Sequence, residues 1–422
     1  MRIVLEVVEG PHCGRSFTFE GHDNFIVGRA RCAHFRLASK DPKISRVHFM
    51  VEVNPPSCRV LDMGSRNGTR VNGRRIQAAD LRHGDLIQCG YTVLKVSVQR
   101  PPEEARGDAA RPSVPSEARP AASDDLASSA PRETAGYRIV RRLHRPGTGK
   151  TYLAIRPSDG AEVALKMIRP AFDASEREAA RLLDDARRLS GLRHPNLVGL
   201  HEATRVDDLF CFVMDYVPGD DAATLLVRSG PLPIGRAVRW ACDVIAALQH
   251  AHDHGFVHGG VKPANWLVTG AGEQETCKLA DFGLGKIYDL SPMSGLTMLG
   301  DPAGTLPYIP PEQVTEYRAS HPEGDQYSTG ATLYRLLTDA FLLDFDEVPA
   351  QHRLVQVIFD PPVPIQRRRP EIPHGLAAAI HRALEKDPAA RFPSIRHFGD
   401  ALAPYRGERA CSEDPDPPAD VV

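Results

Sequence analysis

The sequence has few of the features that mark membrane-spanning, metal-binding or secreted proteins. Its eight cysteines are scattered, with no C-x-x-C pair and no spacing suited to a zinc site. No stretch reaches the roughly 18 consecutive apolar residues of a membrane span. The first residues, MRIVLEVVEGPHCG, lack the continuous apolar core of a signal peptide. We therefore expect a cytoplasmic protein with reduced thiols and no membrane insertion.

The chain also lacks an excess of charge of either sign. Its formal net charge is -2, with 52 Lys and Arg against 54 Asp and Glu. The composition therefore gives no reason to expect a nucleic-acid partner or a polybasic membrane surface. At 422 residues the chain exceeds what one hydrophobic core usually supports, so we expect at least two domains.

Residues 1–99 consist of short runs rich in β-branched residues and separated by turn signals. The runs include RIVLEVV, SFTFE and HFMVEV, and Asn-Gly pairs occur at residues 67–68 and 72–73. Asn-Gly tolerates the positive φ of tight hairpins. The pattern predicts an all-β sandwich.

Two segments have too few large apolar side chains to fold. Residues 100–135 are rich in Pro, Ala, Ser, Arg and Glu, and residues 407–422 are acidic and rich in Pro. Such compositions bury too little apolar surface to offset the entropy of ordering. We predict a disordered linker and a disordered tail.

Residues 136–406 begin with strand-like runs and continue with long helical segments. From Ile234 to Leu248, apolar residues recur at alternating spacings of four and three, which is typical of an amphipathic helix. Gly255 supplies a helix stop. A small β-rich part before a larger helical part predicts a two-lobed α+β domain.

Three motifs in the β-rich part occur in a characteristic order: GR at residues 28–29, SRVH at 45–48 and SRNGT at 65–69. Together they resemble the forkhead-associated (FHA) family, a β-sandwich whose loops bind phosphothreonine peptides. The resemblance implies that Arg29 and Ser45 hold the phosphate, that Arg66 adds charge and that Asn67 bonds the peptide backbone. A guanidinium fork with a hydroxyl donor suits a phosphate dianion.

The same resemblance gives expectations for neighbouring residues and for partners. His48 is expected to brace the Ser45 loop, and Lys43 to read peptide residues beyond the phosphothreonine. The expected partners are threonine-phosphorylated proteins, including a partner Ser/Thr kinase or its substrates. The alternative is that Arg29 and Arg66 are ordinary surface residues of some other sandwich.

A second set of motifs lies in residues 137–405. VALK at residues 163–166, DFG at 281–283, PPE at 310–312, DQYS at 325–328 and Asp387-Pro388 with Arg391 resemble the eukaryotic-type Ser/Thr protein kinases of bacteria. The resemblance implies a protein-kinase fold. Lys166 would contact the nucleotide phosphates, and Asp281 would bind magnesium.

The catalytic loop departs from the family pattern. Residues 258–265 read HGGVKPAN, so Gly260 stands where the family has the aspartate that accepts the substrate proton, and Gly259 replaces an arginine. A positioned general base typically supplies roughly 10²- to 10⁴-fold in rate. We therefore expect no catalytic base and slow or absent phosphoryl transfer.

Two further departures lie near the expected nucleotide. The glycine-rich loop LHRPGTGKTY at residues 143–152 has His144 and Pro146 at the first two glycine positions and keeps only Gly149. Asp185 aligns with the helix glutamate that pairs with Lys166 in the family, and its shorter arm requires the helix to move inward. The GTGKT segment also resembles a Walker A loop but lacks its first glycine.

The groups expected to bind nucleotide are nonetheless retained. Lys166, Lys262, Asn265 and Asp281, with Asp185 and Gly149, form the candidate ATP site, and Asn265 and Asp281 are the candidate magnesium ligands. The alternative is that these residues are only structural polar contacts. His250, His252, His254 and His258 cluster in sequence, and we expect packing rather than metal binding there.

These observations predict a signalling adaptor that binds phosphothreonine proteins and regulates or scaffolds partners through an inactive, ATP-binding pseudokinase. The alternative is an active atypical Ser/Thr kinase, since positioning and charge neutralisation supply much of phosphoryl-transfer catalysis. A third reading is a purely structural spacer. We also hypothesise that Thr134, Thr297 or Thr305 is phosphorylated and bound by an FHA domain in cis or in trans.

Overall fold

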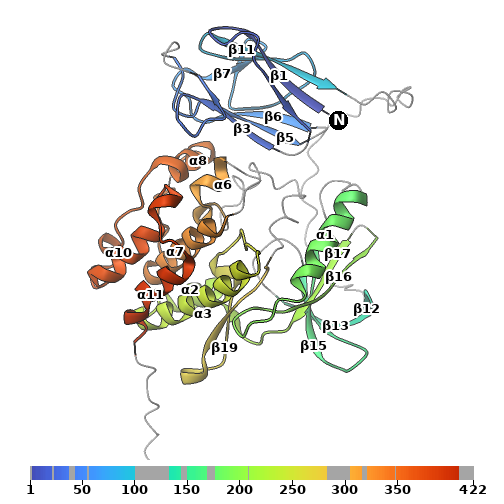
Figure 1. The fold of residues 1–422 in the computed structure, drawn as a ribbon, viewed down its shortest axis with the longest axis vertical. Coiled ribbons are helices and arrows are strands. Elements are labelled where there is room, and N and C mark those ends of the chain that lie inside the picture. Colours follow the sequence, from blue (N-terminus) through green and yellow to red (C-terminus); the bar gives the residue numbers. More distant parts are fainter. Residues whose placement is uncertain are drawn as a thin grey trace, which may run out of the picture.

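The protein folds into a β-sandwich followed by a two-lobed α+β domain (Figure 1). Both parts of the predicted fold class are therefore confirmed. The predicted linker, from residue 100 to residue 132, and the tail from residue 408 lie outside the described residues. The computed structural model describes residues 2–20, 23–37, 43–54, 57–99, 133–143, 150–168, 176–207, 209–282, 305–315, 321–346 and 348–407.

Two sheets form the sandwich, one with the strand order β2-β1-β11-β10-β7-β8 and the other with the order β4-β3-β5-β6-β9. All pairs are antiparallel except β3 with β4. The strands are β1 (Arg2–Glu9), β2 (Ser16–Phe19), β3 (Asp23–Gly28), β4 (Phe35–Arg36), β5 (Phe49–Asn54), β6 (Ser57–Asp62), β7 (Thr69–Val71), β8 (Arg74–Ile76), β9 (Ala78–Asp80), β10 (Leu86–Cys89) and β11 (Thr92–Gln99).

Alternation along the strands builds the sandwich core. In β5, Phe49, Val51 and Val53 are fully buried between the two sheets, because successive side chains of a strand point to opposite faces. At the β7–β8 turn, Asn72 and Gly73 have φ of 50° and 82°. The second predicted Asn-Gly pair therefore forms a tight hairpin.

The smaller lobe of the second domain is a sheet with the order β12-β13-β14-β15-β17-β16, and α1 packs on β16. Its first strand begins before residue 136, the predicted boundary. Ala135 and Gly136 both have positive φ and close a hairpin between β12 and β13, a turn that alanine does not signal. The elements are β12 (Glu133–Thr134), β13 (Tyr137–Leu143), β14 (Lys150–Ile155), β15 (Glu162–Ile168), α1 (Glu176–Leu189), β16 (Leu200–Val206) and β17 (Leu209–Asp215).

The larger lobe is helical around α3 and the buried helix α7, with a small sheet β18-β19-β20. The predicted amphipathic helix is α3, and Gly255 follows its end with a φ of 76°. The elements are β18 (Asp220–Asp221), α2 (Ala222–Ser229), α3 (Ile234–Asp253), β19 (Trp266–Thr269), β20 (Thr276–Leu279), α6 (Pro311–Thr315), α7 (Pro322–Thr338), α8 (Ala350–Phe359), α9 (Ile365–Arg368), α10 (His374–Ala383) and α11 (Ile395–Leu402).

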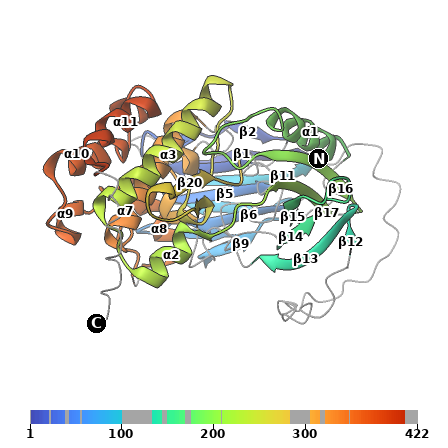
Figure 2. The same ribbon diagram turned by 90° about the horizontal axis from the view of Figure 1, so that it is seen from below.

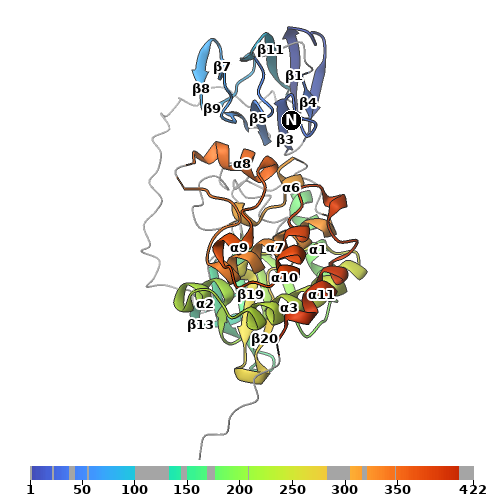
Figure 3. The same ribbon diagram turned by 90° about the vertical axis from the view of Figure 1, so that its left-hand side faces the viewer.

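The three bodies are arranged so that the sandwich faces the helical lobe. Helices α7, α9, α10 and α11 lie on one side and strands β13 to β17 on the other (Figure 2). The sheet that contains β3 and β5 lies next to α6 and α8 (Figure 3). Within the described ranges, no helix combines the length and hydrophobicity needed to cross a membrane.

Candidate functional sites

The first candidate site lies where three loops of the sandwich meet. A Cβ at Gly28, the last residue of β3, would lie 2.2 Å from the carbonyl oxygen of Arg46, so only glycine permits this approach. The backbone N–H of Arg29 donates to the carbonyl of Ser45 over 3.1 Å. These contacts bring the first two predicted phosphate-binding residues, Arg29 and Ser45, together.

His48 is fully buried and supports the Ser45 loop from inside the domain. Nδ1 of His48 accepts from the N–H of Ser45 over 3.1 Å. The hydroxyl oxygen of Ser45 accepts from the N–H of Arg66 over 3.0 Å, and Nδ2 of Asn67 donates to the carbonyl of Lys43 over 2.7 Å. All four predicted phosphothreonine-binding residues therefore belong to one connected set of loops.

Sequence reasoning missed Asp62, which orders the loop that carries Arg66. Its Oδ1 accepts from the N–H of Ser65 over 2.8 Å. Its Oδ2 accepts from the hydroxyls of Ser65 and Thr69, each at 2.6 Å, and from the N–H of Thr69 at 2.9 Å. An aspartate three residues before a serine is a turn signal that could have identified it.

The charge of this site suits an anion. Arg29, Arg66 and Asn67 are exposed, and Ser45 is half-buried. The Nζ of Lys43 lies 4.6 Å from the ring centre of Tyr91. Arg29 and Arg66 both contact Ser45 through their backbone N–H groups, and exposed guanidinium groups on such loops can hold a phosphate through charge-assisted hydrogen bonds.

The second candidate site lies between the two lobes of the second domain. Lys166 of β15 is 5% exposed, and its Nζ lies 2.6 Å from Oδ2 of Asp281. Burial alone would raise the pKa of Asp281, but the charge and hydrogen bond of Lys166, with the charge of Lys262, hold it below its usual value. Asp281 is thus a carboxylate at neutral pH.

We predicted that Asp185 could pair with Lys166 only if its helix moved inward, and in this conformation Lys166 pairs with Asp281 instead. In the described residues, Lys166 has an ion pair with Asp281 and none with Asp185 of α1. Aspartate is one methylene shorter than glutamate. Gly149, His144 and Pro146 lie outside the described residues.

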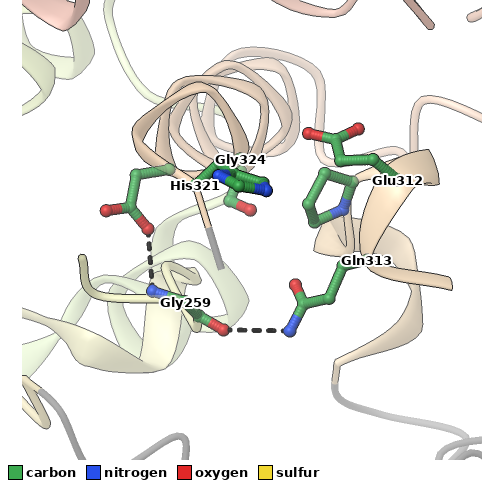
Figure 4. Close-up of a pocket in the computed structure, with 8 residues that line it drawn as sticks. Gly259, Glu312, Gln313, His321 and Gly324 are labelled. Atoms are coloured by element: carbon green, nitrogen blue, oxygen red, sulfur yellow. Dashed lines mark hydrogen bonds between the residues drawn. The ribbon is translucent and has the colours of Figure 1, made fainter. Parts of the chain in front are cut away.

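The catalytic loop is anchored by Asp325 of the buried helix α7. Its Oδ2 accepts from the N–H of His258 over 2.9 Å and lies 2.8 Å from Nε2 of His252. Its Oδ1 accepts from the N–H of Gly259 over 2.8 Å, and Gln313 reaches the Gly259 carbonyl over 3.4 Å beside a small pocket (Figure 4). The backbone of the loop is thus held in place.

His258 is fully surrounded, and burial lowers the pKa of its imidazole. Its Nδ1 accepts from the N–H of Gly260 over 3.1 Å. The neutral ring therefore carries its proton on Nε2, which donates to the carbonyl of Ala280 over 3.0 Å. Its edge packs against the ring of Phe282, with centroids 5.1 Å apart.

Gly260, at the position where the family resemblance predicts the general base, has no side chain. Among the described residues, a Cβ there would meet only ring atoms of His258, at 3.8 and 3.9 Å, which is ordinary contact. Asn265 donates from Nδ2 to the Gly260 carbonyl over 2.9 Å, and Nζ of Lys262 donates to Oγ1 of Thr305 over 3.1 Å. The loop therefore has room for an aspartate but lacks one.

The three candidate phosphorylation sites differ in accessibility. Thr134 has a buried hydroxyl with no hydrogen-bond partner in the described part of the chain. The hydroxyl of Thr305 accepts from Lys262 inside the cleft. Thr297 lies outside the described residues.

The histidines near the end of α3 make packing contacts. His250 lies against His194 and His254, with ring centroids 5.3 and 4.5 Å apart. No group of three or more His, Cys, Asp or Glu side chains suited to a metal ion occurs in the described residues. Elsewhere in the larger lobe, the two terminal nitrogens of Arg391 donate to the two carboxylate oxygens of Glu312, over 2.6 and 2.8 Å.

Known proteins resemble the chain in both parts. Residues 137–398 match the family described as protein kinase domain, and residues 25–90 match the FHA domain family. Serine/threonine-protein kinase pkn3 of Myxococcus xanthus is 34% identical over 278 residues, 65% of this chain and 50% of that protein. Serine/threonine-protein kinase pkn2 from the same organism is 32% identical to this chain over 269 residues, 63% of this chain and 32% of that protein. The chain thus spans half or less of these relatives.

Solved structures agree with these matches. The kinase domain of Mycobacterium tuberculosis PknI has a TM-score of 0.51 and 28% identity, covering 65% of this chain and 96% of that domain. Rad53 1-466 in complex with AMP-PNP has a TM-score of 0.52, covering 96% of this chain and all of that one. At 18% identity that likeness concerns the fold alone. With a match over more than half of its length, the chain belongs to the protein kinase family, and an FHA domain precedes its kinase domain.

Proposed function

We propose that this protein is a phosphorylation-dependent signalling adaptor. Its FHA domain binds threonine-phosphorylated proteins through Arg29, Ser45, Arg66 and Asn67. Its kinase domain binds ATP with magnesium but transfers phosphate slowly or not at all, and it acts on partners by binding them. The single observation that carries the proposal is Gly260 at the base position of an otherwise well-anchored catalytic loop.

The remaining polar groups suit a magnesium nucleotide. Asp281 is held ionised by Lys166, and both Asp281 and Asn265 supply the hard oxygen atoms that magnesium prefers. Lys166 would pair with the phosphates, and Lys262 adds a second cation in the cleft. ATP supplies the charged polyphosphate to which these groups would bind. Gly260 has no side chain that could take a proton from a substrate hydroxyl.

A second candidate function is an active atypical Ser/Thr kinase. The intact pair of Lys166 and Asp281 favours it, as do the relatives, which are named as Ser/Thr protein kinases. In that case the substrate hydroxyl would lose its proton without a protein base, and positioning would supply most of the catalysis.

The decisive experiment restores the missing carboxylate in the full-length chain. Gly260→Asp should raise radiolabelled phosphate transfer from ATP to a generic protein substrate by up to roughly 10²- to 10⁴-fold over a near-background wild type. Gly191→Asp is the matched control, because Gly191 is exposed and, among the described residues, a Cβ there meets only the carbonyl of Arg188, at 3.7 Å. Wild-type transfer that is abolished by Asp281→Asn and unaffected by Gly260→Asp would establish the active kinase instead.

Ligand binding is measured in parallel on the same proteins. ATP with magnesium should raise the melting temperature of the wild type and of Gly260→Asp, and Lys166→Met should remove the shift.

Phosphothreonine binding is tested with a library of phosphothreonine peptides. The library should bind the wild type, and Arg29→Ala should weaken binding roughly 10- to 100-fold, as expected for the loss of one charge-assisted hydrogen bond. Arg70→Ala, an exposed arginine of β7, is the control. Equal binding of unphosphorylated peptides would refute phosphothreonine reading.

A further inference from the structure

The outer face of the β3-β5-β6 sheet carries an apolar row that a free sandwich would expose. Ile26 pairs with Met50, Met50 pairs with Leu61, and Leu61 pairs with Ala78 across four strands. Their strand neighbours Phe25 and Val51 point to the opposite face, into the sandwich core. Yet Ile26, Met50 and Leu61 are 0%, 1% and 0% exposed.

The kinase domain covers this row. Ile26, Met50 and Leu61 belong to one continuous apolar cluster with Val357 and Ile358 of α8. Helix α6 packs against β3, and both helices lie directly below the sheet in two perpendicular views (Figures 1 and 3). The two domains therefore share a hydrophobic core at this face.

Two specific contacts lie at the edge of the covered row. The guanidinium of Arg46 lies over the ring of Phe359, 4.5 Å from its centre. Gly64 has a φ of 72°, and a Cβ there would lie 1.5 Å from Nε2 of His352. A side chain at position 64 would displace the end of the His352 side chain, and the positive φ independently favours glycine.

We propose that the outer face of β3, β5 and β6 is a docking surface whose occupant is the α6–α8 region of the same chain, so that the FHA domain is seated on the kinase domain. Residues 100–132 can reach up to roughly 110 Å when extended, which permits this arrangement within one chain. An apolar row left uncovered would favour aggregation. Arg29, Arg66 and Asn67 stay exposed in the seated state, so the seat leaves the phosphothreonine loops open.

Docking of the FHA domain on the α6–α8 region places the predicted phosphate-binding loops next to helices of the kinase domain. Arg46 follows Ser45 directly, and Gly64 precedes the loop that carries Arg66. A phosphoprotein bound at these loops would therefore be held at a defined position beside α8. This consequence rests on the proposed function, whereas the seat itself does not.

The test uses the full chain with a protease site inserted between residues 101 and 132. After cleavage, we expect the two fragments to co-elute in size-exclusion chromatography with light scattering, at the mass of one chain. Met50→Lys should release the FHA fragment, and Phe359→Lys should do the same by placing a like charge beside Arg46. Val227→Lys is the matched control, since Val227 of α2 is 85% exposed.

Each other result overturns the proposal. Separation of the wild-type fragments would show that the domains are merely tethered, and co-elution at the mass of two chains would show a seat between copies. Continued co-elution of both variants would show that this face does not hold the domains together. Amide NMR dispersion of the released Met50→Lys fragment checks its fold, which should persist because Met50 points away from the sandwich core. Neither nucleotide nor phosphopeptide enters the assay, so its failure is distinct from failure of the proposed function.

Discussion

Gly260 and Gly64 are both glycines at functional positions, for opposite physical reasons. Gly64 has a positive φ that L side chains rarely adopt, and a Cβ there would also displace the end of the His352 side chain, so the backbone conformation favours glycine there. Gly260 has room for a side chain and a φ outside the left-handed region. Nothing in the surrounding described residues therefore requires glycine at position 260, where we predict the base to be missing.

Glu52 is a second residue whose environment sets its chemistry. It is 5% exposed on the outer face of β5, and its Oε1 has no hydrogen-bond partner in the described residues. Asn24 and Arg59 lie beside it across the sheet. Burial raises the pKa of its carboxyl to about 7, and the charge of Arg59 only partly offsets this effect.

The raised pKa predicts a pH dependence of stability. The folded state holds a proton on Glu52 between the unfolded value of 4.5 and about 7, so its contribution is present below pH 4.5 and is lost as pH rises through 7. Glu52→Gln should therefore raise the free energy of unfolding by about 1–3 kcal/mol at pH 8 and change it little at pH 4.5. Calorimetric melts at the two pH values measure this. An equal effect at both would contradict the assignment.

At the scale of elements, α7 shows how a buried helix positions a surface loop. Asp325 and its neighbour Gln326 are each 1% exposed, although both are polar. Gln326 accepts from the N–H of Phe392 over 2.9 Å, while Asp325 accepts from the catalytic loop. The helix thus provides hydrogen-bond acceptors for backbone N–H groups in two loops.

Asp325→Ala should destabilise the kinase domain and disorder its catalytic loop. It leaves the N–H groups of His258 and Gly259 without their acceptor, which should cost about 3 kcal/mol. Urea unfolding followed by tryptophan fluorescence reports on this domain alone, because the chain's two tryptophans, Trp240 and Trp266, both lie in it. Glu323→Ala, in the first turn of α7, is the control. An unchanged midpoint would mean that other contacts hold the loop.

At the scale of the whole molecule, we expect the shared apolar cluster to couple the two domains in thermal unfolding. A domain that loses its partner loses the stabilisation that binding supplies. The apolar row and the Arg46–Phe359 contact are the interactions that would supply this stabilisation.

Calorimetry of the full-length chain should therefore show overlapping transitions for the two domains. Met50→Lys should separate them, with the FHA transition lowered by several degrees, as expected for a loss of about 1–2 kcal/mol in a domain of this size. Val227→Lys should leave the thermogram unchanged. Two separated transitions in the wild type would argue that the domains unfold independently.

Local patterns were enough to predict much of the architecture. Turn signals and alternation indicated the sandwich, spacings of three and four indicated α3, and the motifs indicated both families. The β12–β13 hairpin was missed because Ala135 is not a turn-forming residue type. Asp62 was missed because the turn signal of an aspartate three residues before a serine was overlooked, and its bonds to Ser65 and Thr69 are seen only in the folded loop.

The sequence by itself determined which chemical groups are present: Gly260 at the predicted base position, Lys166 and Asp281 at the predicted nucleotide site, and the motif predicted to bind phosphate. These are residue types within short motifs, so they can be recognised without knowing which distant residues they contact. The tertiary structure alone decided that Lys166 pairs with Asp281 and that Met50 is buried. Both depend on segments far apart in the chain, and alternation in β5 shows only that Met50 faces away from the core. What covers that outer face is decided by the packing of another domain.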